Sequence, residues 1–235
     1  MTSFFSIYFS PSRPTLNYWG GSVSLILAQR GKRNKITLVE IGCGTGSLLN
    51  ELNKHNLETF GYEPSPAAYR MAIEHYHLKN IKNNYFASNT LSIKPDVFLL
   101  YDVIEHLDDP LTLLKDIKDK MGQHSIVIVK SGDACSINAL LYPPKWRYYH
   151  MNQHIMFFSK RALDIIATKA ALKITNYYRF KHAYGGFAIK EFSKNLLKAF
   201  IFRLGIKTFI KEGRAIALSN DHFISVFKLG SVDYK

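Results

Sequence analysis

A buried strand that runs into a glycine-rich turn is the feature that most restricts the fold of this chain. Residues 36–41 are mostly apolar and lead directly into Gly42-Cys43-Gly44-Thr45-Gly46. Glycines at alternate positions let the backbone turn tightly between a strand and a helix, and they let a ligand approach where a Cβ would collide. Glu63 stands 21 residues after Gly42, at the end of the next predicted strand, where a carboxylate can accept both hydroxyls of a ribose. The pattern indicates a nucleoside-binding α/β fold.

Short apolar runs and helix-period segments alternate along the rest of the chain, which favours a doubly wound α/β sheet with right-handed crossovers. Ser65 is predicted to cap a helix that begins at Pro66, and Asp109-Pro110 is predicted to start another. The predicted strands are 36–41, 59–62, 84–87, 96–103, 125–129, 173–179 and 222–229, and the predicted helices are 46–55, 66–77, 109–122, 161–170 and a long stretch within 182–221.

Composition and charge narrow the class of protein. The chain is 47% apolar and 14% aromatic, which excludes a disordered or collagen-like polypeptide. Its net charge of +13 is uneven, because residues 1–144 carry 14 basic and 13 acidic side chains whereas residues 145–235 carry 17 and 5. Such an asymmetry points to an anionic partner: nucleic acid, an acidic lipid surface or a phosphorylated substrate. The alternative is a solvated basic face that only aids solubility.

Targeting signals and cysteine chemistry point to the cytoplasm. Two cysteines cannot build a disulfide framework, so a reduced, cytosolic setting is expected. The apolar residues 4–9 lack a basic leading segment and do not resemble a signal peptide. No run of 18 apolar residues exists, which argues against a spanning helix.

The glycine spacing leaves two cofactor classes open. A dinucleotide fingerprint places its third glycine at position 47, where this chain has Ser47. Four further segments follow in a fixed order: Gly61-Tyr62-Glu63-Pro64-Ser65-Pro66, Leu99 to Pro110 (LLYDVIEHLDDP), Ser125 to Lys130, and His154 to Ser159 (HIMFFS). With the glycine turn, these segments resemble the class I S-adenosylmethionine-dependent methyltransferases, in particular their ubiquinone-type and methyltransferase-23-like branch, over residues 35–180.

The resemblance implies a fold and a set of cofactor residues. The expected architecture is a Rossmann-like, doubly wound seven-stranded sheet, mostly parallel with its last strand antiparallel, and with helices on both faces. The chain is expected to form one domain over 1–235, made of a lead-in (1–34), a cofactor-binding core (35–131), a substrate loop with sheet completion and a basic helical insertion (132–221), and a last strand with a tail (222–235). S-adenosyl-L-methionine would be held by Glu40, Gly42, Cys43, Gly44, Thr45, Gly46, Glu63, Pro64, Asn89, Tyr101 and Asp102.

Asn89 departs from the family pattern. Many relatives carry an acidic residue after the third strand to contact the adenine amine, whereas this chain has Ala87-Ser88-Asn89. Asn89 would then supply a carbonyl oxygen instead.

Methyl transfer to oxygen needs a group that removes a proton, and histidine suits this task at neutral pH. His106 and His154 are the candidate bases, with Asp102 beside them as a third candidate catalytic residue. The plainer interpretations are a histidine next to the Asp109 helix cap and a hydrogen-bonded histidine at the sheet edge. No residue is assigned as a metal ligand. A cation site from Asp102, Glu105, His106 and either His150 or His154 is a separate hypothesis, because small-RNA 2′-O-methyltransferases carry a related set.

The basic C-terminal region has two interpretations. Apolar residues in 189–204 form one helical stripe, with Lys190, Lys194 and Lys198 on another side. The helix would either close over the sheet as a cap or lie on an anionic membrane. Nucleic acid is a weaker expectation, although Trp146, Tyr148 and Tyr149 could stack on bases, a sugar ring or a quinone.

The sequence thus predicts a cytoplasmic, S-adenosylmethionine-dependent methyltransferase that acts on a small-molecule or lipid-linked acceptor, anionic in character, at oxygen. Peripheral contact with an anionic membrane is part of this expectation. The alternatives are an RNA 2′-O-methyltransferase with a divalent-metal site and a non-catalytic binding module of the same fold.

Overall fold

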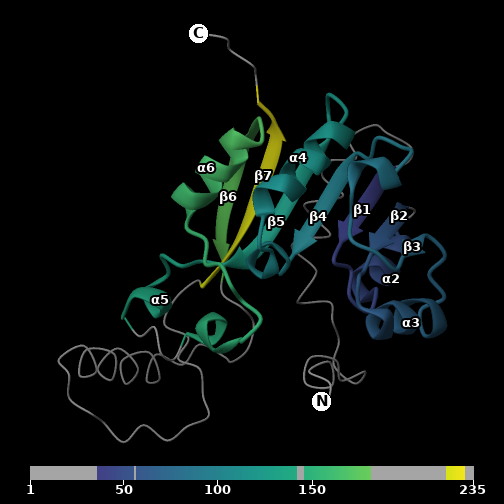
Figure 1. Ribbon diagram of the computed structural model, residues 1–235, viewed down its shortest axis with the longest axis horizontal. Helices are drawn as coiled ribbons and strands as arrows, with labels where there is room; N and C mark the ends of the chain where they lie inside the picture. Colours follow the sequence, from purple (N-terminus) through teal and green to yellow (C-terminus); the bar gives the residue numbers. More distant parts are fainter. Residues whose placement is uncertain (1–35, 56, 142–145, 181–220, 231–235) are drawn as a thin grey trace, which may run out of the picture.

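The computed structural model describes residues 36–55, 57–141, 146–180 and 221–230. Within them, seven strands form one sheet in the order β3-β2-β1-β4-β5-β7-β6 (Figure 1). The pairings among the strands β1 to β5 are all parallel, and β7 is antiparallel to both β5 and β6. The predicted Rossmann-like fold, with its last strand antiparallel, is confirmed.

The elements alternate along the chain as the sequence predicts. The strands are β1 (Thr37–Ile41), β2 (Glu58–Tyr62), β3 (Ile81–Lys82), β4 (Val97–Tyr101), β5 (Ile126–Gly132), β6 (Leu172–Phe180) and β7 (His222–Leu229). The α-helices are α2 (Ser47–Asn53), α3 (Pro66–Glu74), α4 (Pro110–Lys120), α5 (Ile137–Leu141) and α6 (Lys160–Lys169). Short 3-10 helices are η2 (Ser88–Thr90), η3 (Ile104–His106) and η5 (Arg147–His150).

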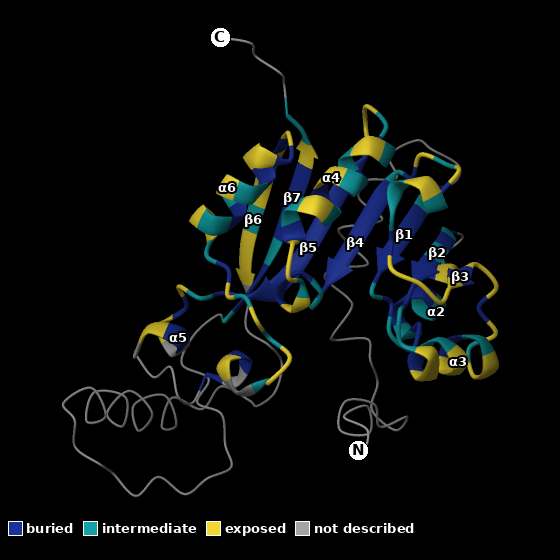
Figure 2. Ribbon diagram, in the orientation of Figure 1, coloured by how far each residue is buried: buried dark blue, intermediate teal, exposed yellow. Residues whose placement is uncertain are grey.

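Two apolar cores cover the two faces of the sheet. Side chains alternate between the faces of a strand, so Phe98 and Leu100 of β4 pack with α4 and α6, whereas Val97 and Leu99 pack on the other face with α2. Strands β4 and β5 are buried throughout, whereas exposed residues lie on the outer sides of the helices, in loops and along the edge strand β6 (Figure 2). Helices on both faces are therefore confirmed.

Capping side chains set the start of two helices where the sequence predicts them. The Ser65 hydroxyl accepts from the backbone N–H of Ala68, and Pro66 takes the first position of α3. At α4, the Asp109 carboxylate accepts from the backbone N–H of Thr112 at 3.1 Å. Both caps satisfy amides that have no partner inside the helix.

Three sequence predictions need correction. The strand expected at 84–87 is wrong, because the strand in that region is Ile81–Lys82, which pairs with Gly61 and Tyr62 of β2. Helix α3 ends at Glu74 rather than near residue 77. The segment 132–158, in which no helix is predicted, contains α5 and η5. The lead-in 1–34 and the amphipathic stripe at 189–204 lie outside the described residues.

In the part of the chain that the structure describes, we find no helix long and apolar enough to cross a membrane.

Candidate active site

The predicted site residues gather at one edge of the sheet, where the parallel strands end. Glu40 is the next-to-last residue of β1, Glu63 directly follows β2, and Asp102 directly follows β4. Crevices at this edge are where open α/β sheets bind ligands. These three residues therefore lie at the same edge of the sheet, in the region where a ligand is expected.

The glycine turn after β1 has the backbone conformation that its sequence requires. Gly42, Gly44 and Gly46 all have positive φ angles, between 55° and 78°. A Cβ on Gly42 would lie 2.6 Å from Val103 Cγ2, so a side chain there would collide with the segment after β4. A Cβ on Gly44 would meet nothing within 4 Å, so the turn is open on that side.

Glu63 fastens this turn to the end of β2. Its Oε2 accepts the backbone N–H of Gly44 at 2.8 Å, and its Oε1 accepts the N–H of Ser65 at 2.7 Å. Asn83 holds the same corner by donating to the backbone carbonyls of Glu63, at 2.8 Å, and Pro64. A carboxylate has about four acceptor positions, so Glu63 keeps capacity for ligand hydroxyls.

One face of the sheet reaches the site through three side chains: Glu40, Tyr101 and Lys130. Register places Tyr101 beside Lys130, and the Lys130 Nζ lies 5.8 Å from the centre of the Tyr101 ring. Burial and the nearby Glu63 carboxylate raise the pKa of Glu40 well above its ordinary value, and Lys130 offsets this only in part. Glu40 Oε2 is buried without a hydrogen-bond partner among the described residues.

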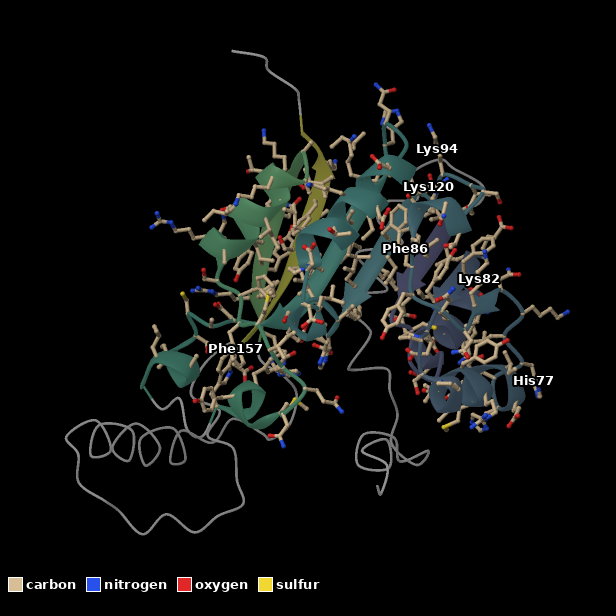
Figure 3. The ribbon with its side chains drawn as sticks, in the orientation of Figure 1. His77, Lys82, Phe86, Lys94, Lys120 and Phe157 are labelled. Atoms are coloured by element: carbon tan, nitrogen blue, oxygen red, sulfur yellow. The ribbon has the colours of Figure 1, made fainter. Side chains whose placement is uncertain are left out.

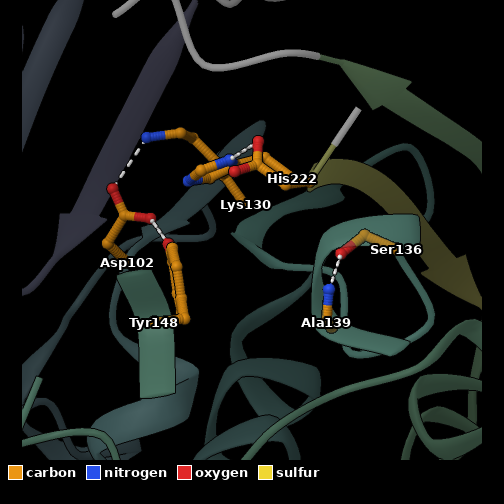
Figure 4. A network of polar contacts seen from close by, with 7 residues as sticks. Asp102, Lys130, Ser136, Ala139, Tyr148 and His222 are labelled. Carbon is orange, nitrogen blue, oxygen red and sulfur yellow. Dashed lines mark hydrogen bonds and ion pairs between the residues drawn. The ribbon is translucent and has the colours of Figure 1, made fainter. Parts of the chain in front are cut away.

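Asp102 sits at the centre of a polar network (Figure 4). One carboxylate oxygen lies 2.7 Å from Lys130 Nζ, and the other accepts the Tyr148 hydroxyl at 2.6 Å. Although burial acts to raise it, the Lys130 ammonium and these hydrogen bonds hold the pKa of Asp102 below its ordinary value. Asp102 also has a φ of 53°, a left-handed conformation that aspartate tolerates better than most residues. The network ties η5 to the ends of β4 and β5.

A second cluster lies immediately after Asp102 and consists of Glu105, His106 and His154. One donor atom from each residue lies within 4.8 Å of the other two. Glu105 is fully buried, and neither carboxylate oxygen has a hydrogen bond of good geometry within the described residues, although Ser131 approaches it. Burial, together with the Asp102 charge, raises the pKa of Glu105 well above its usual range.

The two histidines of this cluster are oriented by backbone carbonyls. His106 Nδ1 lies 2.8 Å from the carbonyl oxygen of Gln153, and His154 Nδ1 lies 2.9 Å from that of Tyr148. A carbonyl only accepts, so each Nδ1 carries a hydrogen, and Nε2 is the nitrogen of each ring that can act as an acceptor. The ring centres are 4.7 Å apart. The structure thus brings His106 and His154 together, as predicted.

Other predicted site residues contribute in more limited ways. The Cys43 side chain is buried in the core against Gly61, where a Cβ would lie 2.8 Å from its Sγ, and burial raises the pKa of its thiol. Only the Cys43 backbone can reach a ligand in the turn. Asn89 is exposed on η2, and Thr45 is buried.

Sequence reasoning missed Lys130 and Tyr148 as site residues and left Glu105 only in the metal hypothesis. A lysine at the end of the apolar run 126–129 was a signal, because a buried lysine at a strand end needs a carboxylate partner. Nothing in the sequence places Tyr148 against Asp102, since 46 residues separate them.

The aromatic residues at 146–149 do not form the exposed stacking surface that the sequence suggested. Trp146 and Tyr148 are buried, with 5% and 6% of their surface exposed, and they stack on each other at 5.6 Å. Tyr149 is exposed and stacks on Phe157 at 6.0 Å. Figure 3 shows Phe157 at the opposite end of the molecule from His77 and Lys82.

Comparison with known proteins decides the family. A family model described as a methyltransferase domain matches residues 17–177, which is more than half of the chain. The chain belongs to this methyltransferase family. Its recognition as a class I S-adenosylmethionine-dependent methyltransferase is confirmed, and it is therefore an enzyme with S-adenosylmethionine as its cofactor.

Solved structures support the fold of this methyltransferase. A methyltransferase from Archaeoglobus fulgidus matches with a TM-score of 0.58 and 16% identity, over 96% of this chain and 100% of the other. Magnesium protoporphyrin IX methyltransferase from Synechocystis, solved with S-adenosylhomocysteine, matches with a TM-score of 0.62 and 10% identity, over 96% and 92%. A plantazolicin methyltransferase matches with a TM-score of 0.60 and 14% identity, over 94% and 87%. No curated protein sequence matches.

The residues at the site of this methyltransferase fit the cofactor. The turn is open at Gly44, and the buried Glu40 has an unpartnered carboxylate oxygen next to it. A cationic amino group would satisfy that oxygen, and ribose hydroxyls match the remaining acceptor capacity of Glu63.

Proposed function

We propose that this methyltransferase modifies an oxygen of a small-molecule or lipid-linked acceptor that carries negative charge, and that it does so in the cytoplasm. The supporting observation is the cluster of Glu105, His106 and His154, which follows β4 at the same sheet edge as the glycine turn. Transfer to a hydroxyl oxygen requires that the nucleophile lose its proton, and this cluster places two imidazoles and a carboxylate at that edge to assist the loss.

The cofactor residues divide their work along the ligand. S-adenosylmethionine supplies a methyl group on a sulfonium, a leaving group that needs no acid. Glu40 and the turn from Gly42 to Gly46 would hold its methionine end, and Glu63 would hold the ribose. Asn89 remains the proposed adenine contact, because it is exposed on η2 next to Thr90, which hydrogen-bonds Tyr62 at the end of β2.

The acceptor side is built by the segment 146–158. Backbone N–H groups of Ile155 and Met156 both donate to the Glu105 carbonyl, at 2.9 and 3.1 Å. Together with the His106 contact to Gln153, these bonds hold the segment against η3. A rigid support of this kind keeps an acceptor hydroxyl within the narrow geometry that methyl transfer requires.

Charge supports an anionic acceptor or an anionic surface that presents it. The excess of basic side chains lies in residues 145–235, which include the acceptor-side segment. Exposed apolar side chains lie in and beside this part of the chain: Ile137 and Leu140 on α5, and Tyr149 and Phe157 in the acceptor-side segment. Basic and apolar side chains together suit peripheral contact with an anionic membrane.

RNA methylation is the weaker candidate. Of the three aromatic rings that could stack on bases, two are buried and therefore inaccessible, those of Trp146 and Tyr148. A non-catalytic binding module would bind S-adenosylmethionine but transfer no methyl group.

A labelled-transfer screen tests the proposed function. The protein is incubated with S-adenosylmethionine labelled in its methyl group and with a cellular small-molecule and lipid extract, in parallel with an RNA pool. We expect label in an anionic, extractable product, joined through an oxygen–methyl bond. Label in RNA alone, or label on nitrogen or carbon, would contradict the proposal. Glu63→Ala is the inactive control and Glu74→Ala, an exposed residue of α3, is its matched partner.

A further inference from the structure

The cluster of Glu105, His106 and His154 has the donor set of a metal site. We propose that these three side chains bind one divalent transition-metal cation, and that the acceptor coordinates this cation through the hydroxyl that is methylated. The inference rests on the proposed function only in its second half, because cation binding does not depend on turnover.

The buried carboxylate is the observation that points to a ligand. Glu105 has no exposed surface, and neither of its oxygens has a hydrogen bond of good geometry within the described residues, although Ser131 approaches the carboxylate. An ionised carboxylate in such a place is costly unless it is paired or coordinates a metal. Lys130, the buried cation nearby, is already engaged at 2.7 Å by Asp102. Lys130 thus forms its ion pair with Asp102, and a bound cation would supply a counter-charge for Glu105.

The histidines are oriented as metal-binding histidines are. Each donates Nδ1–H to a backbone carbonyl, of Gln153 for His106 and of Tyr148 for His154, so Nε2 is the ligand atom of each ring. Histidine ligands of metals usually donate their other N–H to a carbonyl or carboxylate, which fixes the tautomer and the ring orientation. The two rings oriented in this way have centres 4.7 Å apart, so their Nε2 atoms belong to one cluster with Glu105.

The supporting backbone is rigid enough to hold such a site. Glu105 and His106 are neighbours on η3, and His154 lies on a segment whose next two residues hydrogen-bond the Glu105 carbonyl. One candidate donor atom from each residue already lies within 4.8 Å of the other two, and ligands about 2.1 Å from a metal lie roughly 3–3.5 Å apart, so binding would draw these atoms closer by up to about 1.5 Å.

The ligand set defines the class of cation and of acceptor. Two imidazoles and one carboxylate suit first-row transition metals and zinc, and three protein ligands leave open positions for water and substrate. Asp102 is absent from the set, because both of its oxygens are held by Lys130 and Tyr148. A hydroxyl in an open position would lose its proton to solvent more easily. Its oxygen would then bond to the methyl carbon as the carbon–sulfur bond breaks and the sulfonium becomes a thioether.

Metal titration of the full chain tests the site directly. The untagged protein is treated with a chelator, dialysed and titrated with Co²⁺, followed by visible absorption, and with Mn²⁺, followed by calorimetry. We expect saturable binding near one equivalent. Glu105→Gln, which keeps the size of the side chain, should weaken binding at least about tenfold, since even outer-shell changes cost roughly 10–100-fold.

Controls separate the site from general binding and from misfolding. His124→Asn changes an exposed histidine in the turn before β5 and should leave the affinity unchanged. His154→Asn provides a second test if Glu105→Gln does not fold, as judged by circular dichroism. The absence of saturable binding to the wild type, or equal affinities in wild type and folded Glu105→Gln or His154→Asn, would overturn the inference.

The two proposals fail in different ways. Metal binding without methyl transfer to any oxygen acceptor would contradict the proposed function and leave the site standing. Oxygen methylation that is unaffected by a chelator, in a protein that binds no cation, would contradict the metal site and leave the function standing.

Discussion

Glu63 joins the glycine turn to the end of β2 through two short hydrogen bonds. Each bond runs from a backbone N–H to a carboxylate oxygen, at 2.7 and 2.8 Å, and a hydrogen bond to a charged group contributes about 1.5–3 kcal/mol. The same carboxylate is the proposed ribose ligand. It therefore both shapes the turn and contacts the cofactor.

Glu63→Ala should weaken binding of S-adenosylmethionine by roughly 10–100-fold, because at least one charged hydrogen bond to the ligand is lost. Isothermal calorimetry measures this change. Glu74→Ala on α3 serves as the matched control, and an unchanged dissociation constant for Glu63→Ala would show that Glu63 does not contact the cofactor.

Glu40 links pH to stability at the residue scale. Burial and the Glu63 charge raise the pKa of Glu40 in the folded chain above its ordinary value of 4.5. The folded state then holds the Glu40 proton more tightly than the unfolded state, so the free energy of unfolding falls as pH rises from about 4.5 toward the folded pKa.

The side chain introduced by Glu40→Gln is neutral at every pH, so this substitution should remove the loss of stability at higher pH. Without cofactor, the melting temperature of Glu40→Gln relative to the wild type should increase between pH 4.5 and pH 8. Thermal melts across this range measure the difference, with Glu74→Gln as a control. A difference that stays constant or shrinks with pH would contradict the prediction. The same variant should bind S-adenosylmethionine less tightly, since the amino group of the cofactor loses an anionic partner.

At the scale of elements, Tyr148 connects the acceptor-side helix η5 to the end of β4. Its hydroxyl donates to Asp102 at 2.6 Å, and its ring fills the space beside Gly132, where a Cβ would lie 2.6 Å from the ring. Tyr148→Phe keeps the ring and removes the hydrogen bond. Because the Asp102 side chain is 33% exposed, we expect the free energy of unfolding to fall by only about 1 kcal/mol.

This loss should lower the melting temperature of Tyr148→Phe by about 2–4 °C. The rate of methyl transfer should fall by more than the small loss of stability can explain, because η5 supports His154 through the Tyr148 carbonyl. Tyr85→Phe, at an exposed tyrosine, is the control for both measurements. A Tyr148→Phe protein with normal stability and activity would show that the network has no role in positioning.

The positions of the elements also show which parts of the fold are determined by local sequence. Helices α3 and α4 begin where Ser65-Pro66 and Asp109-Pro110 predict, because a cap and a proline act within one turn. The central strands follow their apolar runs for a similar reason. Strand β3 was misplaced because its two residues are selected by pairing with β2, and Phe86, in the segment predicted instead, is buried by contacts with the Tyr62 and Phe98 rings.

The same distinction holds at the site. Glu40, Glu63 and Asp102 were predicted because each ends a strand, and strand ends can be located from sequence. The partners of Asp102 were not predicted, since Lys130 and Tyr148 lie 28 and 46 residues away. Contacts at such separations depend on how the whole sheet is ordered.

For the molecule as a whole, the uneven charge predicts reversible binding to anionic membranes. We expect the full chain to sediment with vesicles that contain phosphatidylserine at about 0.1 M salt and to be released near 1 M, where the Debye length falls to about 3 Å. Changing Lys190, Lys194 and Lys198 to Glu should abolish this binding. Changing the exposed Lys79, Lys94 and Lys115 to Glu alters the net charge equally and should leave most of it. Equal recovery with neutral and anionic vesicles would contradict the prediction.

The position of β7 between β5 and β6 also orders the assembly of the molecule during synthesis. Among the described strands, β6 pairs in the sheet with β7 alone, and β7 is the later of the two to be synthesised. The strands β1 to β5 precede both in the chain and can pair first, whereas β6 gains its described partner only after β7 has been made. In a nascent chain we therefore expect the glycine turn and Glu63 to form before the sheet behind the acceptor segment is complete. Synthesis of β7 would then join the acceptor side to a cofactor side that is already folded.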